Sequence, residues 1–356
     1  MHKIAVIAGD GIGPEVVREG LKVLAHAASV GGFQYELVHY PFSAEHYLKT
    51  NETMPAAALE EMRQLSAIYL GAIGDPRLPA GFLERAIIAT LRFDLDLYVN
   101  LRPVSLFAEH LTPLKGKTPA DIDMVVVREN TEDIYLGVGG FVRQGTPDEI
   151  AIMDVVYTRR GVERIIRYAF ELCRARNRRK KLTLVDKANA IKAHDLWRRT
   201  FAEVGKEYPD VTTDAAYVDA AAMWMVKNPE WFDVMVTTNM FGDILTDLGA
   251  MLQGGMGVAA SGNIHPGRVS LFEPIHGSAP KHAGKNEANP LGAIMAVQMM
   301  LDYLGEKEPA ALIERAVRHL LSTGEITDVS AQSGLPTDRV GDMVVAAMGK
   351  VEALHG

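Results

Sequence analysis

Strands and helices alternate through the first 75 residues, and this alternation constrains the fold more than any other feature of the sequence. The run Ile4–Ala8 is short and apolar, as is typical of a buried strand. A helix is predicted over residues 14–28, because proline is tolerated in the first turn of a helix. The pattern continues with a strand, a helix and a strand at Phe33–Tyr40, Ala56–Leu65 and Ala67–Ile73. Such alternation predicts an α/β domain with a mainly parallel sheet.

The middle of the chain has several strand-like runs with little helix between them. These runs are Tyr98–Phe107, Met124–Arg128, Ile134–Val142 and Ile150–Tyr157. Two helices, at residues 161–176 and 192–206, then surround a strand at Lys181–Asp186. Further helices are predicted near residues 290–304, 308–322 and 337–350. We therefore predict a discontinuous first domain, residues 1–98 with 256–356, interrupted by a mixed α/β domain over residues 99–255.

Composition and charge exclude several classes of protein. The 356 residues are 48% hydrophobic and 23% charged, which is an ordinary globular composition. The net charge of −8 and the absence of a basic block longer than Arg178–Lys181 argue against a nucleic-acid partner. Cys173 is the only cysteine, as suits a reducing compartment. The sequence shows no signal peptide or bilayer-spanning run, so we expect a cytoplasmic protein without a membrane partner.

Two aspartates suggest a metal site. The strand-like run Trp231–Thr238 precedes a helix predicted to begin near Phe241, on which Asp243 and Asp247 share one face. A hard divalent cation with oxygen ligands would relieve the repulsion of their carboxylates, and Asp219 could supply a third oxygen. On spacing alone, an alternative is that Asp243 caps the helix and Asp247 faces solvent.

Arginine and lysine residues near the ends of apolar segments suggest anion binding and acid–base chemistry. Arg92, Arg102 and Arg128 could form an anion-binding crevice, because the guanidinium fork pairs well with carboxylates; the alternative is surface ion pairs. Tyr135 could be a proton donor or an ordinary core tyrosine. Lys187 could act as a base or acid, or be a solvated lysine.

Two glycine-containing loops could approach a nucleotide. The loop Gly9–Glu15 lacks the third glycine of a dinucleotide fingerprint and contains Pro14, so it does not predict a Rossmann fold. The loop Glu273–Gly284 follows a strand-like run and is rich in small residues, so its N–H groups could face phosphate.

Together these segments resemble the β-decarboxylating dehydrogenase family, which includes 3-isopropylmalate, isocitrate, tartrate/D-malate and homoisocitrate dehydrogenases. The matching motifs occur in family order from near residue 4 to near residue 345. They are Gly9–Glu15, Asn100–Pro103, Arg128–Glu132, Asp186–Asn189, Asn239–Asp247 and Glu273–Pro280.

The resemblance implies a two-domain isopropylmalate dehydrogenase-like α/β fold that is not a Rossmann fold, and a homodimer with active sites shared between its chains. The sequence leaves open whether such dimers pair into a tetramer. It implies Mg²⁺ or Mn²⁺ held by Asp243, Asp247 and Asp219 of the partner chain. It also implies that Arg92, Arg102 and Arg128 bind substrate carboxylates. Lys187 of the partner chain and Tyr135 would be the acid–base pair, with Asp219 assisting the lysine.

The resemblance also implies a nucleotide site. Its residues would be Ile12, Ala72, Ile73, Gly74, Asn189, Glu273, His276, Gly277, Ser278, Ala279, Pro280, Lys281 and Asn289. NAD-dependent relatives usually carry aspartate at the position of Lys281, whereas Lys281-His282 resembles the Lys-Tyr of NADP-dependent isocitrate enzymes. Residues 323–338 contain no arginine or tyrosine to complete a 2′-phosphate site. We predict NAD as the cofactor and keep NADP as the alternative.

The substrate prediction rests on the segment before Arg92. Ile88 is apolar where isocitrate enzymes place a polar residue for a third carboxylate, so a hydrocarbon substituent at C3 is favoured. The resemblance therefore favours 3-isopropylmalate, an intermediate of leucine biosynthesis, over D-malate or another 3-alkylmalate, and those over isocitrate. A catalytically silent regulatory subunit is the non-enzyme alternative, but such subunits typically lose a metal aspartate, the lysine or the tyrosine.

Overall fold

The computed structural model describes residues 1–330 and 333–353, which divide into two compact units. Unit 1 comprises Met1–Leu97, Arg102–Ile122 and Ala250–Gly356, and unit 2 comprises Tyr98–Leu101 and Asp123–Gly249. The chain passes from one unit to the other within strand β4 (Val99–Ser105). In the described part of the chain, no helix is long and apolar enough to cross a membrane.

Unit 1 contains a mainly parallel sheet. The strand order is β2 (Tyr35–Tyr40), β1 (His2–Gly9), β3 (Ala67–Ala72), β12 (Leu271–Pro274) and β11 (Ala260–Ile264). Only the pair β11–β12 is antiparallel among these strands. All six residues of β3 are buried, as expected for a central strand covered on both faces. The predicted α/β class is confirmed.

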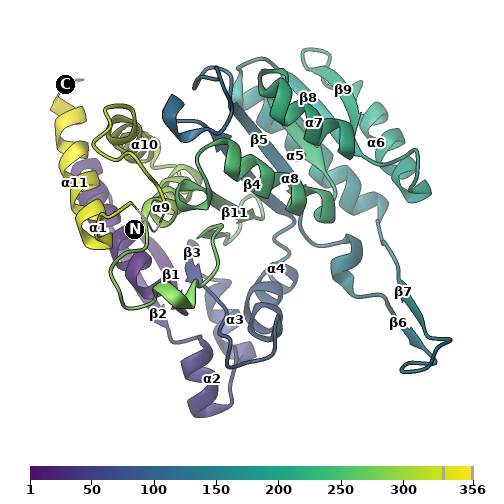
Figure 1. The fold of residues 1–356 in the computed structure, drawn as a ribbon, viewed down its shortest axis with the longest axis horizontal. Coiled ribbons are helices and arrows are strands. Elements are labelled where there is room, and N and C mark those ends of the chain that lie inside the picture. The colour runs from purple at the N-terminus through teal and green to yellow at the C-terminus, as the bar shows by residue number, and fades with distance from the viewer. Residues whose placement is uncertain (331–332, 354–356) are drawn as a thin grey trace. The chain divides into compact units, whose positions relative to one another are not determined.

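Four long helices of unit 1 pack against one another (Figure 1). They are α1 (Gly13–Gly31), α9 (Leu291–Tyr303), α10 (Lys307–Ser322) and α11 (Thr337–Ala353). Helix α9 is buried along most of its length, which its predominantly apolar sequence permits. The shorter helical segments are α2 (Ala44–Thr50), α3 (Ala56–Met62), a π-helical turn (Glu84–Ala89), α4 (Thr90–Asp94) and the 3-10 turns Glu109–Leu111, Met256–Val258 and Pro280–His282.

Unit 2 contains a parallel sheet and a separate hairpin. The sheet order is β5 (Asp123–Glu129), β10 (Val234–Thr237), β8 (Lys181–Asp186) and β9 (Thr212–Tyr217). The helices are α5 (Arg159–Arg176), α6 (Asp195–Gly205), α7 (Val218–Lys227) and α8 (Asn239–Leu252), with 3-10 turns at Asp133–Leu136, Lys192–His194 and Pro229–Trp231. Strands β6 (Gly139–Val142) and β7 (Ile150–Met153) form an antiparallel arm that projects from the rest of unit 2 (Figure 1).

Three predicted elements need correction. The strand predicted over Ile150–Tyr157 ends at Met153, because its partner β6 begins at Gly139, which pairs with Met153. The strand predicted over Ile134–Val142 is wrong in its first half, where Asp133–Leu136 forms a 3-10 turn. Gly137 ends this turn with φ +69°, a conformation that favours glycine, and strand β6 begins only at Gly139. The helix predicted over residues 192–206 begins instead as a 3-10 turn, and α6 starts at Asp195.

The segment Arg102–Ile122 groups with unit 1, whereas the sequence placed it in the inserted domain. Its contacts explain this grouping. The Ser105 N–H donates to Gln253 Oε1 at 2.8 Å, and the Arg318 guanidinium lies 4.6 Å from the centre of the Phe107 ring. Both partners come from the C-terminal part of unit 1.

Candidate active site

Asp10 joins three loops at the carboxyl-terminal edge of strands β1 and β3. Its Oδ1 accepts the Ala44 N–H at 2.7 Å, and its Oδ2 accepts the Gly74 N–H at 3.0 Å. Its own N–H donates to the Ala72 carbonyl at 2.7 Å. Burial raises the pKa of Asp10, although the two backbone N–H groups oppose this. Asp10 therefore positions the Ala72–Gly74 turn that the sequence predicts to contact the cofactor.

The first glycine-containing loop also packs tightly against the Ser278 loop. The Ile12 N–H donates to the Ser278 carbonyl at 2.8 Å. Gly11 has φ +59°, and a Cβ there would lie 1.9 Å from the Ser278 oxygen. Any side chain at position 11 would clash with the Ser278 carbonyl, so only glycine fits there. The backbone that approaches Gly11 this closely belongs to the Ser278 loop.

A cavity of about 240 Å³ lies beside these loops. Its lining includes Ile12, His276, Ala279 and Asn289. Within the described structure, His276 Nε2 and Asn289 Nδ2 are buried without a hydrogen-bond partner. Burial lowers the pKa of His276 and favours its neutral form. An apolar cavity with two unsatisfied polar nitrogens fits part of a nucleotide, such as its base and ribose.

Glu273 is held within a polar cluster in unit 1. Its Oε1 accepts Asn263 Nδ2 at 2.8 Å and Arg92 Nη2 at 3.2 Å. Arg92 Nε is buried without a partner in the described structure, so this guanidinium keeps a donor for a further anion. Ile88, one turn earlier, is half-buried and packs against the core of unit 1.

Charges of both signs lie on the loop that follows Pro280. Lys281 is exposed, and His282 Nδ1 lies 2.8 Å from Glu287 Oε1. Lys285 Nζ lies 3.8 Å from the same carboxylate oxygen. Glu287 therefore offsets part of the positive charge of this loop.

Arg128 is tied to the helix that carries the predicted metal aspartates. Its side chain is 1% exposed. Nε and Nη2 donate to Asn239 Oδ1 at 3.0 and 2.7 Å, and Nη1 donates to Asp243 Oδ1 at 2.8 Å. The guanidinium lies 5.4 Å from the centre of the Tyr135 ring. The structure thus brings Arg128, Tyr135 and Asp243 together.

The predicted metal ligands do not form a complete set in one chain. Asp243 and Asp247 lie on successive turns of α8, and their oxygens suit Mg²⁺ or Mn²⁺. However, the described residues contain no group of three or more His, Cys, Asp or Glu side chains able to hold a metal ion. The contribution of Asp219 from a partner chain remains a prediction.

Asp219 instead pairs with the predicted catalytic lysine of its own chain. Lys187 Nζ lies 2.5 Å from Asp219 Oδ1, and this bond lowers the pKa of the Asp219 carboxyl. Lys187 begins the turn after β8, where its carbonyl accepts the N–H groups of Ala190 and Ile191. Asn189, also in this turn, is exposed. The remaining predicted substrate ligand, Arg102, is buried in β4.

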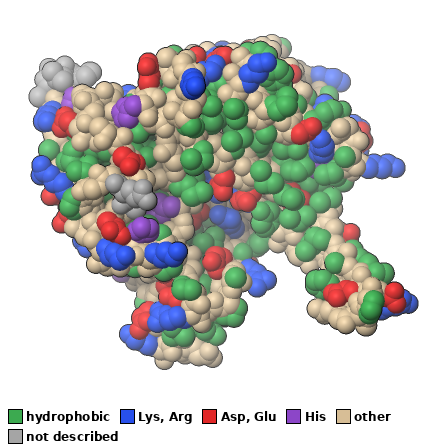
Figure 2. Space-filling view, viewed as in Figure 1, with side chains coloured by type: hydrophobic (Ala, Val, Ile, Leu, Met, Phe, Trp, Pro, Cys, Tyr) green, Lys and Arg blue, Asp and Glu red, His purple; other side chains and the backbone are tan. Residues whose placement is uncertain are grey.

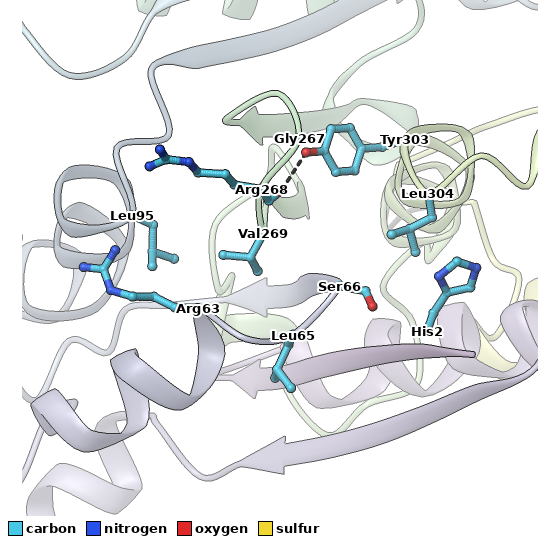
Figure 3. A pocket seen from close by; sticks show the side chains of 10 residues that line it. All are labelled: His2, Arg63, Leu65, Ser66, Leu95, Gly267, Arg268, Val269, Tyr303 and Leu304. Atoms are coloured by element: carbon cyan, nitrogen blue, oxygen red, sulfur yellow. Dashed lines mark hydrogen bonds between the residues drawn. The ribbon is translucent and has the colours of Figure 1, made fainter.

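A second cavity, of about 640 Å³, is not lined by any predicted site residue. It lies in unit 1, where side chains including His2, Arg63, Arg268 and Tyr303 surround it (Figure 3). The cavity opens near the amino-terminal edge of β1 and β3, away from Asp10 and the Ser278 loop. The nucleotide prediction therefore concerns the smaller cavity.

Sequence reasoning missed Asp10 and Asn239 as organising residues. The acidic residue between two glycines in Gly9-Asp10-Gly11 was the available signal for Asp10, because a carboxylate can collect the N–H groups of neighbouring loops. Nothing in the sequence shows that Asn239 would face Arg128, since the two residues lie 111 positions apart.

Known proteins match the chain over nearly all of its length. The sequence profile of the Isocitrate/isopropylmalate dehydrogenase family matches residues 3–344. The 3-isopropylmalate dehydrogenase of Thermobifida fusca is 53% identical over 88% of this chain and 90% of the relative. That of Nocardia farcinica is 49% identical over 97% of this chain and 100% of the relative.

Solved structures share the fold. The isocitrate dehydrogenase of Methylococcus capsulatus has a TM-score of 0.87 and 39% identity, covering 98% of this chain and 99% of the other. A β-decarboxylating dehydrogenase of Thermococcus kodakarensis has a TM-score of 0.81 and 34% identity, covering 99% of this chain and 98% of the other. The chain belongs to the isocitrate/isopropylmalate dehydrogenase family.

Proposed function

We propose that the protein catalyses the metal-dependent oxidative decarboxylation of 3-isopropylmalate, with hydride transfer to NAD. The observation that carries this proposal is the identity of about half of all positions with 3-isopropylmalate dehydrogenases over nearly the whole chain. The apolar side chain of Ile88, one turn before Arg92, supports an alkyl substituent rather than a third carboxylate. D-malate or another 3-alkylmalate is the second candidate. Isocitrate is the third, and the fold shared with the Methylococcus capsulatus isocitrate dehydrogenase at 39% identity keeps it among the substrates to be tested.

The residues of the chain supply the steps around the substrate. Arg92, Arg102 and Arg128 bind its carboxylates. Lys187, oriented by Asp219, removes the proton of the 2-hydroxyl as C2 loses its hydride. After the carboxylate at C3 leaves as CO₂, Tyr135 provides the proton at C3.

Asp243, Asp247 and Asp219 are proposed to hold Mg²⁺ or Mn²⁺. When bound, the cation supplies Lewis-acid polarisation of the 2-oxygen, and NAD supplies the hydride acceptor. The ion pair of Arg128 with Asp243 reduces the repulsion between the two α8 carboxylates before any cation binds.

A homodimer is proposed because the metal ligands are incomplete in one chain and apolar side chains are exposed. On the arm, Phe141 and Met153 are each 60% exposed. Figure 2 shows apolar side chains along the arm. Met223 and Ile244, on α7 and α8, are 62% and 55% exposed. Exposed apolar surface of this kind is typical of a subunit interface. In the dimer, each chain provides Lys187 and Asp219 to the site whose α8 aspartates belong to its partner.

Substrate and cofactor choice can be tested together by measuring NADH or NADPH formation with 3-isopropylmalate, D-malate and isocitrate, with and without Mn²⁺. We expect the highest kcat/KM with 3-isopropylmalate and NAD, and no turnover after chelation. Lys187→Ala should lower kcat by about 10²-fold or more. Lys206→Ala, at an exposed lysine of unit 2, is the control and should not change kcat. No turnover of any of the three substrates would refute the proposal, and a preference for D-malate or for isocitrate would support that substrate instead.

A separate variant tests whether the protein prefers NAD or NADP. Lys281 would attract a 2′-phosphate, but Glu287 counteracts it and favours NAD. Lys281→Asp should raise the ratio of NAD to NADP kcat/KM by about ten-fold, because aspartate accepts ribose hydroxyls and repels phosphate. A wild-type preference for NADP would show that Lys281 dominates this loop.

A further inference from the structure

A hydrogen-bond relay in unit 2 connects the Lys187 turn to the start of α8. The Lys187 N–H donates to His194 Nδ1 at 2.8 Å, and His194 Nε2 lies 3.1 Å from the Tyr157 hydroxyl. That hydroxyl donates to Asp133 Oδ1 at 3.0 Å, and Asp133 Oδ2 accepts the Met240 N–H at 2.9 Å. Three side chains thus join two backbone groups that lie 53 positions apart in the sequence.

The directions of these hydrogen bonds are fixed. A backbone N–H can only donate, so His194 Nδ1 must accept and the proton of the neutral ring is on Nε2. Nε2–H then donates to the Tyr157 oxygen, which leaves the hydroxyl proton for Asp133. Burial lowers the pKa of His194, although Asp186 and Asp133 oppose this, and the neutral form that the relay needs is favoured.

Packing and backbone geometry hold the relay in place. His194 and Asp133 are 0% and 1% exposed. Asp133 has φ +74°, a left-handed conformation that is uncommon outside glycine, and its carboxylate also accepts the Ile134 N–H at 2.9 Å. The Tyr157 ring meets Trp197 edge-on with centroids 5.9 Å apart, and the His194 ring meets Phe241 at 5.5 Å.

We infer that His194, Tyr157 and Asp133 are positioning residues whose two ends serve different active sites of the proposed dimer. This inference rests on the proposed function, in which Lys187 of one chain serves the site whose α8 aspartates belong to the partner. One end of the relay orients the Lys187 turn for one site. The other end fixes the start of α8, and thus Asp243 and Asp247, for the other site.

Single substitutions test the lysine end. His194→Leu removes the acceptor for the Lys187 N–H and should lower kcat about ten-fold or more, with KM changed less than about three-fold. His194→Asn should restore most of kcat, because its amide oxygen can accept the same N–H. Tyr208→Phe, at a tyrosine of unit 2 whose hydroxyl bonds Glu171 at 2.7 Å, is the matched control and should behave as wild type.

Heterodimers test whether the two ends of the relay serve different sites. One chain carries Lys187→Ala and the other Asp247→Asn, so only one complete site remains. It uses the α8 aspartates of the first chain and Lys187 of the second. Tyr157→Phe in the first chain should weaken Mn²⁺ binding, measured from free Mn²⁺ by electron paramagnetic resonance. Tyr157→Phe in the second chain should lower kcat at saturating Mn²⁺ and leave Mn²⁺ binding unchanged.

The outcomes distinguish an effect of the relay from a general loss of stability. They also distinguish failure of the relay from failure of the proposed function. Equal losses whichever chain carries Tyr157→Phe, or no loss in either, would overturn the relay. If His194→Asn does not recover kcat, the proposed role of the relay at the Lys187 turn is wrong. An inactive wild-type enzyme would refute the proposed function, whereas Mn²⁺ titration of Tyr157→Phe would still test the α8 end.

Discussion

At the scale of single residues, Arg128 is the side chain that organises the start of α8, which carries the proposed metal ligands. A buried guanidinium requires partners for its donors, and Asn239 and Asp243 provide them from one turn of α8. The same turn therefore presents Asp243 beside a fixed positive charge. The geometry of this contact depends on the absence of a side chain at Gly242.

Gly242→Ala should lower both stability and activity. A Cβ at this position would lie 2.4 Å from Arg128 Cγ and 2.6 Å from its Cβ, so Arg128 would have to move. Overpacking of this kind typically costs about 1–3 kcal/mol, which outweighs the gain of about 1 kcal/mol in helix propensity. The free energy of unfolding in urea and kcat/KM measure the two effects.

Gly349→Ala on α11 is the matched control. A Cβ at Gly349 meets no atom within 4 Å, so only helix propensity should act. We expect this control to be more stable by about 0.5–1 kcal/mol with unchanged kcat/KM. Gain of stability in both variants would contradict the packing of Arg128 against Gly242.

Glu129, next to Arg128, should make stability depend on pH. Burial raises the pKa of Glu129 from 4.5 to about 7, although N–H groups of Thr131 and Glu132 oppose this. Between these values the unfolded chain has released the proton that the folded chain retains, so this contribution to stability falls as the pH rises. The shift corresponds to about 3 kcal/mol.

Glu129→Gln removes this titration. We compare the free energies of unfolding of the variant and the wild type at each pH. The variant's value should gain about 3 kcal/mol relative to the wild type's between pH 4.5 and pH 8. Other titrating groups, including His194, cancel in this difference. A difference that stays flat over the range would show that Glu129 titrates near its ordinary value.

At the scale of elements, the β6–β7 arm has little support from the described part of its own chain. All eight residues of its two strands are exposed, and isolated two-stranded hairpins are only marginally stable. The arm exposes four large apolar side chains, those of Phe141, Ile150, Ile152 and Met153. They lie on both faces of the hairpin, and the described chain covers neither face. A partner chain would supply the missing contacts.

Ile152→Asp should therefore dissociate the proposed dimer, because it places a charge in the apolar interface that we propose for the arm. Sedimentation velocity at micromolar concentration measures the shift to monomer, with loss of activity expected in parallel. Asp148→Ser, at an exposed position of the arm outside its strands, is the control and should remain dimeric. A dimeric Ile152→Asp would exclude the arm from the interface.

The sequence predicted elements where apolar periodicity was strong and missed them where it was weak. Strands β1, β3 and β8 and helices α1, α9 and α10 lie where the pattern placed them, to within a few residues. Strand β9, with the sequence Thr-Thr-Asp-Ala-Ala-Tyr, is an edge strand with mostly exposed residues, so no alternation marks it. Strand β11 is buried but contains Ser, Gly and Asn, which gave no strand signal.

At the scale of the whole molecule, the predicted site residues divide between the two units. Unit 1 carries the Ser278 loop and the cavity with unsatisfied nitrogens, whereas unit 2 carries the α8 aspartates and the Lys187–Asp219 pair. Motif recognition supplied the identities of these residues. It could not supply their partners, because the contacts of Asp10, Arg128 and His194 depend on which loops the folded chain brings together.

The proposed sharing of active sites between chains can be measured directly by complementation. Lys187→Ala and Asp247→Asn homodimers should each be nearly inactive. After dissociation and re-association in equal amounts, half of the dimers would contain one chain of each kind and one complete site, so about a quarter of wild-type activity should return. No recovery, with heterodimers shown to have formed, would place Lys187 and Asp247 in the same site of one chain and contradict this account.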